Sequence, residues 1–260
     1  MKEEVLRVFA TSPEAVGLQR TRWRLGDLVG RLPLAVSSRS GLWNALRRLG
    51  IRYRQGWAYL VSPDPLAQAK LRFIDQIQRR AQAQPERVVV LWLDEVTFYR
   101  LPTLAPTWCE GRGRARKAQM RAGSNTCARV LAALNAASGS THYLLRSKIG
   151  ASELCQFYQQ LRAAYADAAE IYVIQDCWPV HFLPEVCAAA CQWEVALVAF
   201  PTYSSWRNPI EKLWRWLKQA VLHMHRWAED WQQTKRAVRD FLDRFALPSP
   251  ALLRYVGLSA

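Results

Sequence analysis

Three acidic residues stand where a buried core usually excludes charge. Asp94 follows the apolar run VVVLWL, Asp176 follows the apolar run IYVIQ, and Glu211 falls in the first turn of a predicted helix. A buried carboxylate without a partner is costly, so each needs a cation or hydrogen-bond donors nearby. Three carboxylates that meet at one place offer hard oxygen ligands to Mg²⁺ or Mn²⁺. Two such ions suit phosphoryl transfer, and this is the chemistry that the acids predict.

Each acid also has an ordinary structural interpretation. Asp94 could pair with an Arg at the end of its strand, and Asp176 could cap the helix that follows it. Glu211 fits a capping box, because Asn208 can cap a helix that has Pro209 in its first position and Glu211 in its third. Taken singly, each acid favours the structural interpretation. Taken together, beside basic stretches of the kind that bind DNA, the three favour a metal site.

The elements around these acids predict an α/β domain. Strands are expected within 88–95, 126–136, 141–147, 171–176 and 194–200, and helices over 66–83, 151–166, 179–191, 208–225 and 227–245. This order is that of the ribonuclease-H-like fold, with a mixed five-stranded sheet and flanking helices. The strands that end at Asp94 and Asp176 would then lie side by side. A helix that carries Glu211 could pack over the same edge of the sheet.

The first 60 residues carry a large share of the positive charge. They hold 11 Lys and Arg against 4 acidic residues, in a chain whose formal net charge is +15. Helices are predicted over 21–31 and 38–49, followed by a β-hairpin around Gln55 and Gly56 within 51–62. This is the order of a small winged helix-turn-helix, whose second helix enters the major groove. The concentrated charge favours nucleic acid as the partner.

The expected DNA contacts fall in two basic stretches. The second helix and the wing contribute Arg39, Asn44, Arg47, Arg48, Arg52 and Arg54. A basic loop after the strand of Asp94 is expected to touch the DNA backbone through Arg112, Arg114, Arg116, Lys117 and Arg121. The alternatives are a helical cap with a solvated basic face and a solvated turn.

Composition shifts divide the chain into four predicted regions. They are a DNA-binding region over 1–62, a linker helix over 63–86, a catalytic domain over 87–225 and a C-terminal helical extension over 226–260. The apolar runs are far shorter than the ~20 residues that a membrane span needs, so no membrane partner is expected. The six cysteines, in a chain without a recognisable signal peptide, are expected to be reduced thiols. The expected compartment is the cytoplasm.

Three motifs in order resemble those of the DDE transposases of the mariner superfamily, in its bacterial insertion-sequence branch. LWLDEVTFYRLPT resembles the first-acid motif, QDCWPVH the second and PTYSSWRNPIEKLWRWLK the third. Between Asp176 and Glu211 lie 34 residues, which is the spacing of this branch. The resemblance covers 88–221 well and the N-terminal region more loosely. It assigns Asp94, Asp176 and Glu211 as the catalytic and metal-binding residues.

The resemblance implies an enzyme that uses two Mg²⁺ or Mn²⁺ ions. Water cuts the DNA at the ends of the element, and the freed 3′-hydroxyl then attacks target DNA, usually at a TA dinucleotide. The implied partners are double-stranded terminal inverted repeats, target DNA and a second copy of the chain, in a bacterial, nucleoid-associated setting. Glu95, Cys177, His181 and Asn208 stand within the motifs and are expected to support the site.

Departures from the family pattern favour an alternative function. Cys177 stands where the family usually has Asn, and a thiol is a poor replacement for an amide that supports metal ligands. Ser205 and Arg207 stand where Pro and an apolar residue are usual. Relatives usually have two helix-turn-helix units, whereas this sequence shows only one. The alternative is a catalytically impaired relic that binds DNA or represses its own element. A third interpretation is another ribonuclease-H-like nuclease, which would cleave without joining strands.

Overall fold

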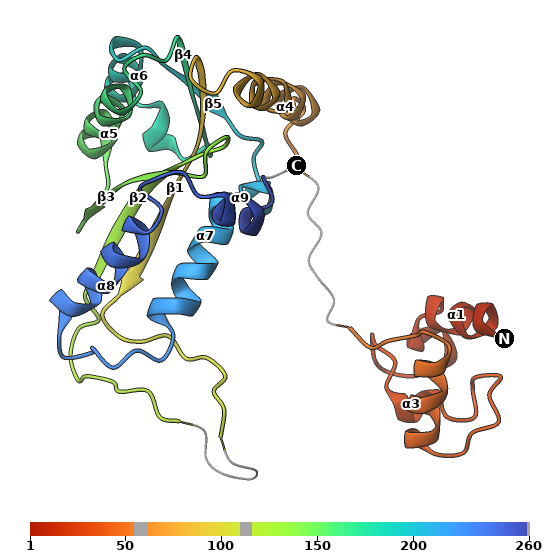
Figure 1. Ribbon diagram of the computed structural model, residues 1–260. Helices are drawn as coiled ribbons and strands as arrows, with labels where there is room; N and C mark the ends of the chain where they lie inside the picture. Colours follow the sequence, from red (N-terminus) through yellow and green to blue (C-terminus); the bar gives the residue numbers. More distant parts are fainter. Residues whose placement is uncertain (55–61, 110–115, 259–260) are drawn as a thin grey trace. The chain divides into compact units, whose positions relative to one another are not determined.

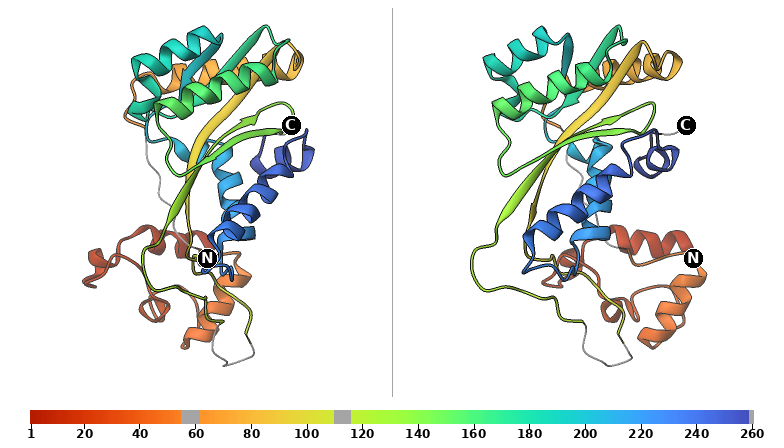
Figure 2. Two further views of the ribbon diagram at one scale, coloured as in Figure 1. Left: turned by 90° about the vertical axis from the view of Figure 1, so that its left-hand side faces the viewer. Right: turned by 60° about the vertical axis from the view of Figure 1, so that its left-hand side comes forward.

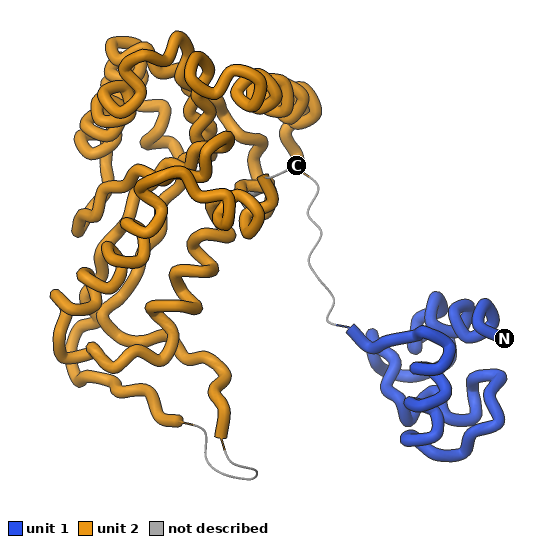
Figure 3. Tube along the Cα trace, in the orientation of Figure 1, with its two compact units in different colours: residues 1–59 blue, residues 60–260 orange. Residues whose placement is uncertain are grey.

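A computed structural model describes residues 1–54, 62–109 and 116–258. The chain divides into two compact units, residues 1–59 and 60–260, which Figure 3 shows in different colours. The sequence predicted a division after residue 62. Each unit has a hydrophobic core of its own.

The first unit is helical. Its elements are α1 (Lys2–Ala10), the 3₁₀ turn η1 (Pro13–Val16), α2 (Leu25–Leu28) and α3 (Arg39–Arg48). The helix predicted over 38–49 is confirmed as α3, since Ser38 Oγ accepts a hydrogen bond from Gly41 N at 3.1 Å and caps it. Leu42 and Leu46 of α3 pack with Val5 of α1 in the core.

Other predictions for this unit need correction or remain open. The helix predicted over 21–31 is wrong in length, because only the single turn α2 forms, and α1 was not predicted. Ten residues separate α2 from α3, which is longer than the tight turn of a helix-turn-helix. The predicted hairpin wing falls mainly on 55–61, outside the described residues, and 51–54 carry no strand.

The second unit is built on a mixed five-stranded sheet, as predicted (Figure 1). Its strands are β1 (Val88–Tyr99), β2 (Cys127–Asn135), β3 (Thr141–Arg146), β4 (Glu170–Gln175) and β5 (Val195–Ala199). Their order is β3-β2-β1-β4-β5. The β1–β2 and β2–β3 pairs are antiparallel, whereas β1–β4 and β4–β5 are parallel. β1 is therefore central, and both faces of its first half are buried.

Helices cover both faces of this sheet (Figures 1 and 2). One face packs against α4 (Ala67–Ala83), α7 (Ile210–Leu217), α8 (Trp231–Asp243) and α9 (Pro250–Val256). The other face packs against α5 (Ala151–Ala164) and α6 (Pro184–Gln192). Alternate residues of β1 pack into two hydrophobic cores, one on each face of the sheet. Val90 and Trp92 lie on the α7 face, and Val89 and Leu91 lie on the α5 face. The linker helix and the C-terminal region thus both belong to the core of the second unit.

The structure corrects several helix boundaries. The helix predicted over 179–191 is broken into the 3₁₀ turn η2 (Pro179–Phe182) and α6, because Pro184 holds Leu183 in an extended conformation. The helix predicted over 208–225 is α7 followed by one π-helical turn, η4 (Lys218–Leu222). The helix predicted over 227–245 is the shorter α8, and α9 was not predicted. In the described part of the chain, no helix is both long enough and apolar enough to cross a membrane.

Candidate active site

Asp94 and Asp176 occupy matching positions on two neighbouring parallel strands. The β1–β4 ladder ends at the pair Trp92 and Ile174, and each acid lies two residues further along the chain, Asp94 within β1 and Asp176 directly after the last residue of β4. The prediction that Asp94 ends its strand is wrong, because β1 continues to Tyr99 as the antiparallel partner of β2 alone. Asp94 therefore marks the point where β1 leaves β4. A main-chain ladder on one side still fixes its position.

Helix α7 brings Glu211 to the same place. α7 packs on β1, and Trp214 of α7 donates a hydrogen bond from Nε1 to Asp94 Oδ2 at 2.9 Å. Glu211 lies one turn before Trp214 on the same helix, so the two side chains are neighbours. Trp214 was not singled out from the sequence. Its spacing of three residues from Glu211 was the available signal.

The three acids act on one another electrostatically. Burial raises the pKa of Asp94 to about 7, and the charges of Glu211 and Glu95 add to this effect. Burial also raises the pKa of Glu211; Lys218 and Arg215 oppose the shift, and the charge of Asp176 adds to it. Neither Asp94 nor Glu211 forms a salt bridge with any described residue. Among the described residues, the charges of Asp94 and Glu211 are thus not neutralised by a direct ion pair.

The side chains do not yet stand as a preformed metal cage. Across residues 1–54, 62–109 and 116–258, no group of three His, Cys, Asp or Glu side chains is arranged to hold an ion. The acids gather at one edge, but their carboxylates have not converged.

The structure also tests the ordinary interpretations of the three acids. Asp94 is bound by Trp214, and no described Arg forms a salt bridge with it, so the alternative interpretation of an arginine pair is not found. The Glu211 carboxylate makes no hydrogen bond to the described backbone, so it does not complete a capping box, although Asn208 Oδ1 accepts from Ile210 N at 3.3 Å. Asp176 does accept a local hydrogen bond from Trp178 N at 3.0 Å. Only this last acid keeps part of its structural interpretation.

His181 lies against two of the acidic residues. It is fully buried on η2, with Nε2 3.0 Å from Glu95 Oε1 and Nδ1 3.2 Å from Asp176 Oδ1. Burial opposes a charge on the ring, but the bonds to Asp176 and Glu95 outweigh it and raise the pKa of His181 to about 9. The same bond from His181 lowers the pKa of Asp176. The predicted supporting residues Glu95 and His181 are therefore connected to the site.

Comparison with known proteins identifies the family. Residues 89–235, more than half of the chain, match the family model of the DDE superfamily endonucleases. The chain belongs to this family. The predicted resemblance to DDE transposases of the mariner group is confirmed, and all three acids lie within the matched region.

Individual relatives of this DDE endonuclease agree with that assignment. An uncharacterised 39 kDa protein of insertion element IS630 from Shigella sonnei is 25% identical over 240 residues, which cover 89% of this chain and 67% of the relative. The Mos1 mariner paired-end complex with Mn has a TM-score of 0.66 at 14% identity, over 99% of this chain and 75% of that one. The Mos1 paired-end complex with the left transposon end has a TM-score of 0.64 at 15% identity, over 99% and 74%. At such identities the solved structures establish a shared fold.

The Cys177 thiol of this DDE endonuclease is bonded to backbone. Its Sγ donates a hydrogen bond to the backbone oxygen of Phe200, at the end of β5, over 3.2 Å. Asn208 is buried at the start of α7, where it holds the backbone of the helix that carries Glu211. Cys177 and Asn208 thus contact backbone close to the site.

The predicted DNA contacts are solvent-accessible wherever they are described. Exposed side chains include Arg39, Asn44, Arg47 and Arg48 of α3, then Arg52 and Arg54, and on the loop after β1 Arg116, Lys117 and Arg121. Arg39 lies against Gly26 of α2, and Arg121 pairs with Glu229 at 3.3 Å. Arg112 and Arg114 fall outside the described residues.

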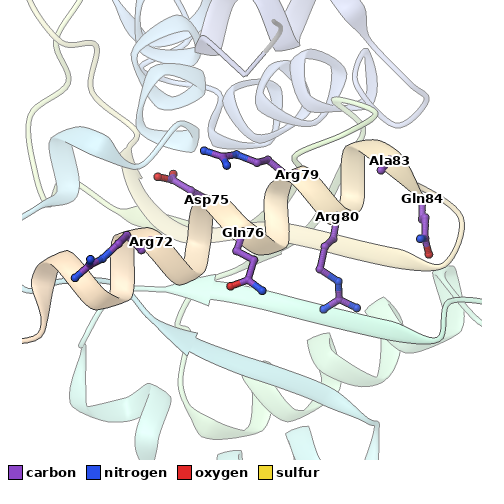
Figure 4. Close-up of a pocket in the computed structure, with 7 residues that line it drawn as sticks. All are labelled: Arg72, Asp75, Gln76, Arg79, Arg80, Ala83 and Gln84. Carbon is purple, nitrogen blue, oxygen red and sulfur yellow. The ribbon is translucent and has the colours of Figure 1, made fainter.

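Two surface cavities lie apart from the acids. One of about 570 Å³ runs along α4, where Arg72, Asp75, Gln76, Arg79, Arg80, Ala83 and Gln84 line it (Figure 4). The other, of about 920 Å³, belongs to the first unit and includes Trp23, Trp43 and Tyr53 in its wall. Neither contains Asp94, Asp176 or Glu211, so neither is the candidate active site.

Proposed function

We propose that this chain is a DNA transposase that cleaves the ends of an insertion element and joins the 3′-hydroxyl to target DNA. The observation that carries the proposal is the matched register of Asp94 and Asp176 on β1 and β4, with Glu211 held beside them through the Trp214 hydrogen bond. Membership of the DDE endonucleases and the likeness to an IS630 protein support it.

Asp94, Asp176 and Glu211 are the residues that would hold two divalent ions. The donor set fits, because it consists of carboxylate oxygens, and neither Asp94 nor Glu211 forms a salt bridge with a described residue. Bound Mg²⁺ or Mn²⁺ would supply Lewis-acid chemistry, lowering the pKa of water and stabilising the leaving oxygen. The proposal requires the three carboxylates to move closer than they stand in the structure. The bound cations would drive this movement, because they would neutralise the repulsion between the three carboxylates.

The residues of the chain supply orientation and DNA binding. Trp214 holds one oxygen of Asp94, and no protein nucleophile is needed because a water and a DNA hydroxyl perform the two attacks. The exposed side chains of α3 and of the loop after β1 would bind DNA phosphates, whose contacts position the strand without reading its sequence. Arg39, Arg47 and Arg48 of α3 and Arg116, Lys117 and Arg121 of the loop supply part of the large positive charge of the chain.

The proposed partners are double-stranded terminal inverted repeats, target DNA with TA sites and a second copy of the chain. The Mos1 structures hold transposon-end DNA in paired-end complexes, which supports this choice. The proposed setting is the bacterial cytoplasm, in association with the nucleoid.

The direct test replaces Asp94 by Asn, Asp176 by Asn and Glu211 by Gln, one at a time. Each variant should lose cleavage of terminal-repeat DNA in Mg²⁺ while it still binds that DNA. Asp75→Asn, an exposed acid on α4, is the matched control and should cleave normally. Cleavage that survives all three substitutions contradicts the proposal.

A catalytically impaired, DNA-binding relic is the second candidate. The observation that favours it is Cys177, whose thiol bonds to the Phe200 carbonyl instead of supporting Asp176. Binding of terminal-repeat DNA without cleavage in Mg²⁺ or Mn²⁺, with cleavage restored by Cys177→Asn, would establish this candidate. A strand-transfer assay separates both from a nuclease that cleaves without joining.

A further inference from the structure

The pairing of β1 with β4 stops just before the acids. The last ladder pair is Trp92 and Ile174, so no ladder bond fixes Asp176 relative to β1. The imidazole of His181 links Asp176 to β1 instead, because it contacts Glu95 Oε1 of β1 at 3.0 Å and Asp176 Oδ1 at 3.2 Å. A side-chain bridge thus continues where the main-chain ladder ends.

Burial makes this bridge rigid. His181 has no solvent-exposed surface, and a buried ring nitrogen without a partner is costly. Nε2 faces the Glu95 carboxylate, and Nδ1 faces the carboxylate and the backbone oxygen of Asp176. All of these oxygens accept, so both ring nitrogens donate. The ring also packs edge-on against Trp178, with 5.4 Å between centroids and 80° between planes. The ring is therefore held from three sides.

The bridge leaves one oxygen of Asp176 available. Oδ1 receives a hydrogen bond from Trp178 N at 3.0 Å and forms an ion pair with His181 Nδ1 at 3.2 Å. The same Nδ1 also lies 3.3 Å from the backbone oxygen of Asp176, so His181 contacts both the side chain and the main chain of this residue. Oδ2 receives none from the described residues, and the Asp176 side chain is 55% exposed. The carboxylate is thus fixed through one oxygen while the other stays open to a ligand.

We propose that His181 is a positioning residue that orients the Asp176 carboxylate toward the metal by bracing it against Glu95. This inference rests on the proposed function, because Asp176 must be a metal ligand for its orientation to matter. Partners that orient a metal ligand are worth about 10–100-fold in metal affinity or activity. Glu95 acts from the opposite face of β1 to Asp94, so it belongs to the support and not to the metal site.

Two amide substitutions separate the two bonds of the ring. An Asn side chain places its NH₂ near the position of His Nδ1, whereas Gln reaches toward the position of Nε2. His181→Asn therefore keeps a donor for Asp176, and His181→Gln keeps a donor for Glu95. His225→Asn is the matched control, because His225 is also buried and its Nδ1 accepts a hydrogen bond from Trp227 N.

The experiment titrates Mn²⁺ into the full-length protein without DNA and follows free Mn²⁺ by electron paramagnetic resonance. His181→Gln should weaken Mn²⁺ binding by about 10–100-fold, and His181→Asn by less than about 10-fold. His225→Asn should bind Mn²⁺ as the wild type does. The Mg²⁺ concentration for half-maximal cleavage should shift in the same order, with unchanged affinity for terminal-repeat DNA.

Equal Mn²⁺ affinity in His181→Gln and wild type would overturn the inference, and so would equal losses in all three variants. Wild-type protein that binds no Mn²⁺ also overturns it. If the predicted order of Mn²⁺ affinities is found but the wild type cuts no DNA, the proposed function fails and the positioning role of His181 stands.

Discussion

Replacing Asp94 by Asn is expected to stabilise the metal-free protein while it removes activity. In the unfolded chain this carboxyl ionises near 3.8, and in the folded chain near 7, because burial and the charges of Glu211 and Glu95 disfavour its ionised form. The folded state therefore loses stability as pH rises from about 4 to about 7, and the loss is complete above that range. Asn cannot ionise, and its Oδ1 can still accept the hydrogen bond from Trp214.

The size of the effect follows from the two pKa values. Their difference corresponds to roughly 4 kcal/mol above pH 7, and screening by solvent on the open side of Asp94 lowers this to about 2–4 kcal/mol. At pH 5 the gain should be about two fifths of that at pH 8, because pH 5 lies only about one unit above the pKa of this carboxyl in the unfolded chain. The variant should thus gain more at pH 8 than at pH 5.

The assay is urea unfolding in EDTA at pH 5 and pH 8, followed by Trp fluorescence. Nine of the 12 Trp residues belong to the second unit, so the signal reports mainly on the unit that holds Asp94. Asp64→Asn is the opposite-sign control, because a hydrogen bond from Lys70 lowers the pKa of Asp64 and its ionised form is the stabilising one. The reasoning is refuted if Asp94→Asn is no more stable than wild type at pH 8, or if its gain is the same at both pH values.

Three further perturbations test the same picture. Trp214→Phe removes the hydrogen-bond donor to Asp94 from a fully buried position. It should lower the free energy of unfolding by about 2–4 kcal/mol and reduce cleavage. Trp216 does not bond to Asp94, so Trp216→Phe should leave cleavage unchanged. Mg²⁺ at ten times its dissociation constant should raise the free energy of unfolding by about 1.4 kcal/mol in wild type and not in a variant lacking one of the acids, as thermal shift would show. Gly139→Ala should lower the unfolding midpoint, by a cost of at least about 1–2 kcal/mol, because φ is +73° and a Cβ would lie 2.5 Å from the Ser249 carbonyl oxygen; an unchanged midpoint contradicts this.

Much of the fold could be predicted because its signals are local. Apolar runs marked the five strands, and Ser38 marked the start of α3 through a hydrogen bond only three residues away. Boundaries that depend on partners distant in sequence were missed. The run VVVLWLDE could not show that β1 extends to Tyr99, because that extension is paired with β2 alone. The break before α6 was readable from Pro184, whose ring constrains the residue before it.

The candidate site divides in the same way. Asp94 and Asp176 could be found from the sequence because an acidic residue directly after an apolar strand is unusual, and a few neighbouring residues are enough to show it. Trp214 was missed because an apolar face predicts burial equally well whether or not the indole nitrogen has a carboxylate partner. His181 was expected near the site because it stands in the same motif as Asp176, but its bond to Glu95 joins residues 86 apart in sequence. Only a tertiary structure can supply that pairing.

The adjacent acids Asp94 and Glu95 show how one dipeptide can serve two purposes. Successive side chains of a strand point to opposite faces, so neighbours in sequence cannot both reach a metal on one side of the sheet. Asp94 meets Trp214 on the α7 face, and Glu95 meets His181 on the α5 face. A substitution at Glu95 should therefore act on Asp176 through His181 and leave the Asp94–Trp214 bond intact. This separation makes Glu95 and His181 a supporting layer that can be altered without removing a proposed metal ligand.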